Sequence, residues 1–117
     1  MSDMDPAPTP PNVTVQVYVP RVAYERIAPD DVKAAAVRMG YTGPLRWESS
    51  THKMPDYAPT GAVRLTCRVR IAVALLDSFR ALAERAGSGH ETDVVVASGI
   101  AFKILSDGID AALRKNF

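Results

Sequence analysis

The sequence has a single cysteine, Cys67, and no excess of charge of either sign. One cysteine cannot form an internal disulfide, so the chain does not have the pattern of a disulfide-stabilised secreted domain. The 14 Lys and Arg residues nearly balance the 13 Asp and Glu residues. Global charge therefore favours neither a nucleic acid nor a membrane surface as partner, and any such affinity has to come from a local patch.

Long hydrophobic runs are also missing, since no stretch of 18 or more apolar residues occurs. Residues 1–6 carry neither the basic region nor the apolar segment of a secretory signal. We therefore expect no membrane partner and a cytoplasmic location. The 117 residues, 47% of them hydrophobic, are enough for one core and fit one domain.

The sequence offers little for catalysis or metal binding. Its two histidines, His52 and His90, lie in separate polar segments without a cysteine or second histidine at metal-ligand spacing, whereas zinc needs three or four convergent ligands. Neither a Gly-x-Ser-x-Gly motif nor a phosphate-binding glycine loop occurs. The carboxylate pairs at 30–31 and 107–110 fit a helix start and a solvated helix face. We expect no enzyme activity, no cofactor and no metal site.

The clearest pattern is the alternation of apolar and other side chains from residue 62 to residue 73. It predicts a strand whose one face is buried and whose other face carries Arg64, Arg68 and Arg70. Cys67 falls on the apolar face and is expected to be a small buried side chain. Arginines two residues apart on a strand lie about 7 Å from each other, so these three would form a cationic stripe.

In other segments, too, apolar residues recur with the period of a strand or a helix. Residues 12–19 alternate and stop at Pro20, which predicts a strand, and residues 45–49, which include Trp47, predict another. Residues 29–39 and 74–86 have the helical period, and so does the chain from residue 100 onward. Residues 1–11 contain four prolines and are expected to form a disordered tail ahead of a single domain at 12–117.

Residues 93–97 allow two interpretations. The run Val94-Val95-Val96 favours a strand, while Ser88 and Glu91 match a capping box that begins a long helix. The β-branched run makes the strand the preferred interpretation. The expected fold is then α+β, with a β-α-β-β-α-β order of the ferredoxin-like split β-α-β type, an antiparallel sheet covered by helices and an added C-terminal helix. With a helix at 93–97, the sheet has three strands packed on three helices.

We expect the protein to act by binding another protein, as an inhibitor, immunity or accessory protein. Aromatic and arginine side chains dominate the energetics of interfaces, and residues 50–61 form a long loop with apolar groups beside the sheet. The expected partner-binding residues are Tyr18, Trp47, Met54, Tyr57, Arg64, Arg68 and Arg70. The same surface, or a free edge strand, could also form a homodimer.

The alternative is a nucleic-acid-binding protein that uses the arginine stripe, with Tyr18 as a stacking platform. The expected third strand lacks the aromatic residues of an RNA-recognition motif, which weakens that hypothesis. A third interpretation is that the arginines form only a solvated outer face, with Glu48 beside them. A pocket for a small molecule is compatible with the composition but leaves no pattern in the sequence.

Overall fold

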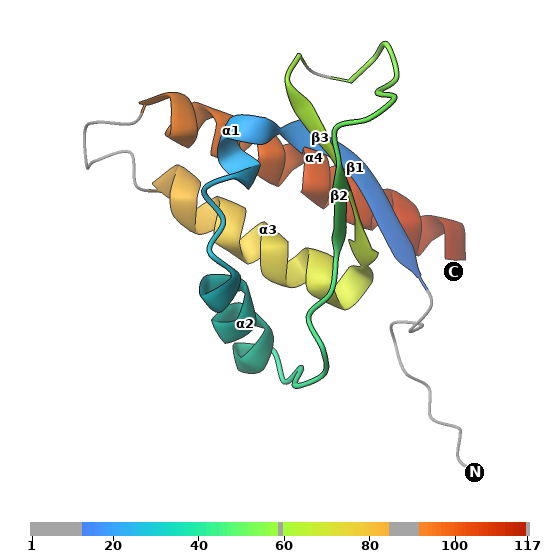
Figure 1. Ribbon diagram of the computed structural model, residues 1–117. Helices are drawn as coiled ribbons and strands as arrows, with labels where there is room; N and C mark the ends of the chain where they lie inside the picture. The colour runs from blue at the N-terminus through green and yellow to red at the C-terminus, as the bar shows by residue number, and fades with distance from the viewer. Residues whose placement is uncertain (1–12, 59, 85–91, 117) are drawn as a thin grey trace.

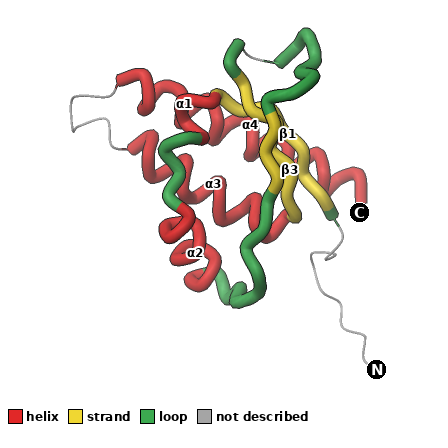
Figure 2. Tube along the Cα trace, viewed as in Figure 1, coloured by secondary structure: helices red, strands yellow, loops and turns green. Residues whose placement is uncertain are grey.

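The computed structural model describes residues 13–58, 60–84 and 92–116. The expected tail at 1–11 and the Ser88–Glu91 capping box lie outside the described residues. The fold is α+β, with three strands and four helices in the described part of the chain (Figures 1 and 2). In chain order the elements are β1 (Thr14–Pro20), α1 (Arg21–Tyr24), α2 (Pro29–Arg38), β2 (Glu48–Ser50), β3 (Ala62–Arg68), α3 (Val69–Ala83) and α4 (Thr92–Asn116).

The sheet has the order β1-β3-β2, and β3 pairs antiparallel with both neighbours. Because successive side chains of a strand point to opposite faces of the sheet, the paired residues of β1 and β3 form two rows, one on each face. Val15 lies opposite Cys67, and Val17 lies opposite Leu65. All four of these side chains are buried. The predictions of a strand at 12–19 and of a buried Cys67 are confirmed.

The helices cover the side of the sheet on which these apolar side chains lie. Helix α4 packs against β1, α3 packs against α4, and α2 packs against α3 (Figure 1). Phe79 and Leu75 of α3 and Leu105 of α4 are completely buried in the resulting core. The helix–sheet contact is close enough that Gly108 of α4 lies directly on Val17.

Helix α2 forms where the sequence predicts it. Pro29 begins the helix, where its missing N–H leaves one fewer unpaired donor. Asp30 and Asp31 lie in the first turn, where their negative charge interacts favourably with the positive end of the helix dipole. Gly40 follows the helix with φ +84°, a conformation that glycine adopts without steric cost. Met39 continues the helical period of the buried Val32, Ala35 and Ala36, but it is exposed.

The prediction of one strand from 62 to 73 is wrong beyond Arg68. Helix α3 begins at Val69, five residues before the expected start at Ala74, and Arg70 therefore lies on a helix. The buried residues Ile71, Ala72 and Leu75 are spaced one and three apart, so they also form a helical stripe. Packing of that stripe against α4 and α2 decides between two periods that the sequence satisfies equally well.

The preferred strand at 93–97 is also wrong, because α4 runs from Thr92 to Asn116. Ala97, Ala101, Leu105 and Ile109 recur every four residues and are buried, so tertiary packing overrides the β-propensity of the valines. The described sheet consequently lacks the fourth strand of the expected ferredoxin-like order. The expected strand at 45–49 is shorter and shifted, and the four-residue helix α1 was not predicted.

Among the described residues, no helix is both long enough and apolar enough to cross a lipid bilayer.

Candidate functional site: the outer face of the sheet

The second row of side chains on the sheet points away from the helices and is polar. Tyr18 lies opposite Arg64, Gln16 lies opposite Thr66, and Glu48 of β2 lies on the other side of Thr66. These side chains are exposed or half-buried, in contrast to the apolar row on the other face. We call this surface the outer face, and a partner can reach it.

Three side chains gather at one end of the outer face. The rings of Tyr18 and Tyr57 lie 5.6 Å apart in an edge-to-face arrangement at 86°. The Arg64 guanidinium carbon lies 5.8 Å from the centre of the Tyr18 ring, within the range of a cation–π contact. Tyr57 is 79% exposed. We call Tyr18, Tyr57 and Arg64 the outer-face cluster.

Arg64 also holds the loop at 50–61 against the sheet. Its guanidinium donates a hydrogen bond of 2.7 Å to the backbone carbonyl of Lys53. Lys53 has φ +54°, an uncommon conformation for a residue with a side chain. The backbone N–H of His52 donates to Ser50 Oγ at 3.1 Å. One arginine therefore links the loop to the aromatic pair.

The two phenols of the cluster have shifted acidities of opposite sign. The Arg64 guanidinium lowers the pKa of Tyr18, chiefly through a hydrogen bond that favours the phenolate. The hydrogen bond to Tyr18 raises the pKa of Tyr57, and the negative charge that Tyr18 acquires acts in the same direction. Tyr18 therefore ionises first.

The structure places Trp47, Arg68 and Arg70, three of the other expected binding residues, away from this cluster. Trp47 is half-buried and packs against the core, and its indole Nε1 donates a hydrogen bond of 3.0 Å to Tyr24 Oη. Arg70 lies in the first turn of α3. Arg68 remains on the outer face, at the far end of β3, and Met54 is half-buried in the loop. The stripe of three arginines expected from the sequence is thus not formed, because Arg70 lies on α3.

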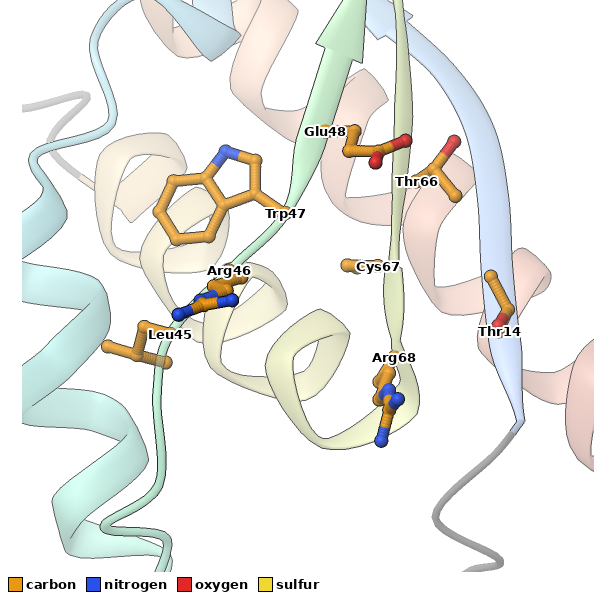
Figure 3. Close-up of a pocket in the computed structure, with 8 residues that line it drawn as sticks. All are labelled: Thr14, Leu45, Arg46, Trp47, Glu48, Thr66, Cys67 and Arg68. Atoms are coloured by element: carbon orange, nitrogen blue, oxygen red, sulfur yellow. The ribbon is translucent and has the colours of Figure 1, made fainter.

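A pocket opens at that far end, between β3 and the segment that leads into β2. Figure 3 shows its lining residues, and its volume is about 620 Å³. We call it the β2–β3 pocket. It is lined by Thr14, Leu45, Arg46, Trp47, Glu48, Thr66, Cys67 and Arg68. Sequence reasoning missed Leu45 and Arg46, although Leu45 and Trp47 alternate with Arg46 and Glu48 and so indicate an extended segment with one apolar face.

The Cys67 thiol and the possible metal ligands bear on the chemistry of these sites. Burial raises the pKa of the Cys67 thiol to about 12, so the thiolate needed for nucleophilic attack is scarce at neutral pH. No group of three or more His, Cys, Asp or Glu side chains that could hold a metal ion occurs within residues 13–58, 60–84 and 92–116. The prediction that the protein lacks enzyme activity remains a prediction.

Comparisons with protein-family models, with curated proteins and with solved structures find no match to this chain.

Proposed function

We propose that this protein is a non-enzymatic interaction module that binds another protein through the outer face of its sheet and the loop at 50–61. The observation that best supports this proposal is the outer-face cluster, in which an exposed tyrosine of the loop lies beside a tyrosine and an arginine of the sheet. Tyr and Arg are the residue types most often found at the energetic centres of protein interfaces. Inhibitor, immunity and accessory proteins in the cytoplasm are the roles that fit this proposal.

The cluster is also held in place before a partner binds. Arg64 contacts Tyr18 and the Lys53 carbonyl, and Tyr18 contacts Tyr57. Side chains that are already ordered lose less conformational entropy on association, which favours affinity. Loop and sheet therefore present one surface to a partner.

Nucleic-acid binding through Arg64, Arg68 and Arg70 receives less support from the geometry. Arg70 lies on α3, and the Arg64 guanidinium already contacts a ring and a carbonyl. A single-stranded nucleic acid usually stacks successive bases on aromatic side chains, and here the one tyrosine on β1 already forms an edge-to-face pair with Tyr57. This function stays as the second candidate.

Site-specific photo-cross-linking tests the proposal. A benzoylphenylalanine replaces Tyr57 in one version of the protein and Lys103, on the exposed face of α4, in the control version. We expect position 57 to capture one protein in the native cell and position 103 not to capture it. Equal capture at both positions, capture of nucleic acid alone, or no capture at position 57 would contradict the proposal.

Purified components then give the affinity. Tyr57→Ala and Tyr18→Ala are each expected to weaken binding of the captured protein about tenfold or more, which corresponds to about 1.4 kcal/mol. Lys103→Gln is expected to leave the affinity unchanged. If the captured protein is a second copy of this chain, light scattering will show a dimer that Tyr57→Ala dissociates.

A further inference from the structure

The β2–β3 pocket exists because the two strands differ in length. Pairing between them ends at Glu48 and Thr66, whereas β3 continues to Arg68 before α3 begins. The segment at 45–47 therefore leaves the sheet instead of closing against β3. Arg68, at the far end of β3, lies about 13 Å along the strand from Arg64. The pocket shares no lining residue with the outer-face cluster, so the two sites are separate.

The inner part of this pocket is apolar. In Figure 3 the Cys67 side chain points from β3 toward the segment that carries Trp47. Cys67 is buried, and Leu45 and Trp47 pack against the core. The hydrogen bond from Trp47 Nε1 to Tyr24 Oη fixes the indole, so the pocket has a rigid aromatic wall.

The rim of the pocket is polar and carries uncompensated positive charge. Arg46 and Arg68 are exposed, and neither forms an ion pair with any residue in the described part of the chain. Glu48 is the one carboxylate that lines the pocket, so two arginines against one glutamate leave a net charge of +1. Four other arginines do contact carboxylates, namely Arg21, Arg38, Arg80 and Arg114.

We propose that the β2–β3 pocket binds a small amphipathic anion. The flat apolar body of the ligand lies against Trp47 and Cys67, and its carboxylate or phosphate lies between Arg46 and Arg68. The volume of about 620 Å³ falls within the range of about 300–1,000 Å³ typical of small-molecule sites. Glu48 on the same rim disfavours ligands whose charge is spread over several anionic groups, because like charges repel.

Fluorescence with 8-anilinonaphthalene-1-sulfonate tests this proposal, because the probe combines flat apolar rings with one anionic group. Trp47 is the only tryptophan of the chain, so its emission reports on the pocket alone. We expect saturable binding to a single site, with a rise in probe emission and quenching of Trp47. Octanoate and phenyl phosphate, added as competitors, then show whether the site prefers a carboxylate or a phosphate.

Charge variants distinguish the pocket from unspecific binding of the probe. Arg46→Gln and Arg68→Gln are each expected to weaken binding about tenfold, and Lys103→Gln, distant on α4, to leave it unchanged. Glu48→Gln is expected to strengthen binding severalfold at the same single site, whereas a folding defect would expose apolar surface and add further probe sites. Equal affinity in all four variants, several probe sites, or no binding would overturn the proposal.

Discussion

Gly108 of α4 lies so close to Val17 of β1 that a methyl group on Gly108 would overlap with Val17 Cγ1. Gly108→Ala therefore forces the helix away from the sheet or moves Val17 out of its position. Overpacking of this kind costs about 1–3 kcal/mol, and we expect a loss of that size in the free energy of unfolding measured with urea.

Gly99 provides the matched control for this variant. It lies in the same helix, and a methyl group there meets no atom within 4 Å. Since alanine is favoured over glycine in helices by about 1 kcal/mol, Gly99→Ala is expected to stabilise the protein. Destabilisation of similar size in both variants would contradict this explanation, because only Gly108 contacts Val17.

Ser98 carries a hydroxyl that no described residue satisfies. The side chain is completely buried on α4, and its Oγ has no hydrogen-bond partner there. Removal of a buried unpaired polar group is expected to stabilise the protein by about 1–2 kcal/mol. Ser98→Ala should therefore raise the midpoint of thermal unfolding. Ser78→Ala is the comparison, because the Ser78 hydroxyl donates to the Ala74 carbonyl; a larger gain in that variant would disprove the argument.

Cys67 makes stability depend on pH in the alkaline range. The unfolded chain releases the thiol proton near pH 9.0, whereas burial raises the pKa of folded Cys67 to about 12. The contribution of this group is present below pH 9.0 and is lost as the pH rises toward 12, with a slope of up to about 1.4 kcal/mol per pH unit. Urea titrations of the native protein and of Cys67→Ala, compared across this range, measure the effect.

The same thiol should react slowly in the folded protein. Cys67 is only 5% exposed, so a disulfide reagent is expected to modify it much faster after denaturation than before. A rate that is equal in the two states would show that the thiol is accessible. A ligand in the β2–β3 pocket should slow the reaction further, because Cys67 lines that pocket.

The ionisation of Tyr18 depends on Arg64. In Arg64→Gln the pKa of Tyr18 should rise toward its ordinary value of 10.0, because the guanidinium that stabilises the phenolate is gone. Carbon NMR titration of the tyrosine rings measures this shift. Arg68→Gln, at the far end of β3, should leave the Tyr18 titration unchanged; an equal shift in both variants would contradict a local effect of Arg64.

The two tyrosines also affect stability in opposite directions. The pKa of Tyr18 is lowered on folding, so its contribution to stability is present above pH 10.0 and is lost as the pH falls through the folded value. The pKa of Tyr57 is raised, so its contribution is present below pH 10.0 and is lost as the pH rises through the folded value. The two pH ranges adjoin at pH 10.0, so the stability due to the pair rises with pH below 10.0 and falls with pH above it.

Sequence periodicity identified β1 and α2 because each has one period and a clear terminator. Val15 and Val17 fit only a strand that stops at Pro20, and Ala35 and Ala36 fit only a helix that stops before Gly40. Both elements are also bounded by residues whose backbone preferences are strong.

The ends of β3 and the start of α4 could not be predicted in the same way. Val69, Ile71 and Val73 continue the alternation of the strand, and no glycine or proline marks the change to a helix. Val94 and Val95 favour a strand locally, but the buried Ala97 and the residues that follow it at intervals of four favour a helix. In both segments long-range packing decides, and local sequence does not contain that information.

The candidate site, too, could be predicted from the sequence only in part. Alternation placed Tyr18 and Arg64 on one face of the sheet, and the structure brings them together. The fold of the loop determines that Tyr57 joins them while Trp47 turns toward the core. The β2–β3 pocket depends on where a three-residue strand ends, which the sequence pattern does not show.

Along β1 and β3, neighbouring residues lie alternately in the core and on the outer face. Val17 and Leu65 hold the core, while Tyr18 and Arg64, one residue away, make no contribution to that packing. Outer positions that do not hold the loop, unlike Arg64, can therefore be randomised in a library while the inner ones stay constant. A few substitutions on the outer face would thus change the chemistry of that surface while the core stays intact, which is the property required of a scaffold for engineered binding proteins.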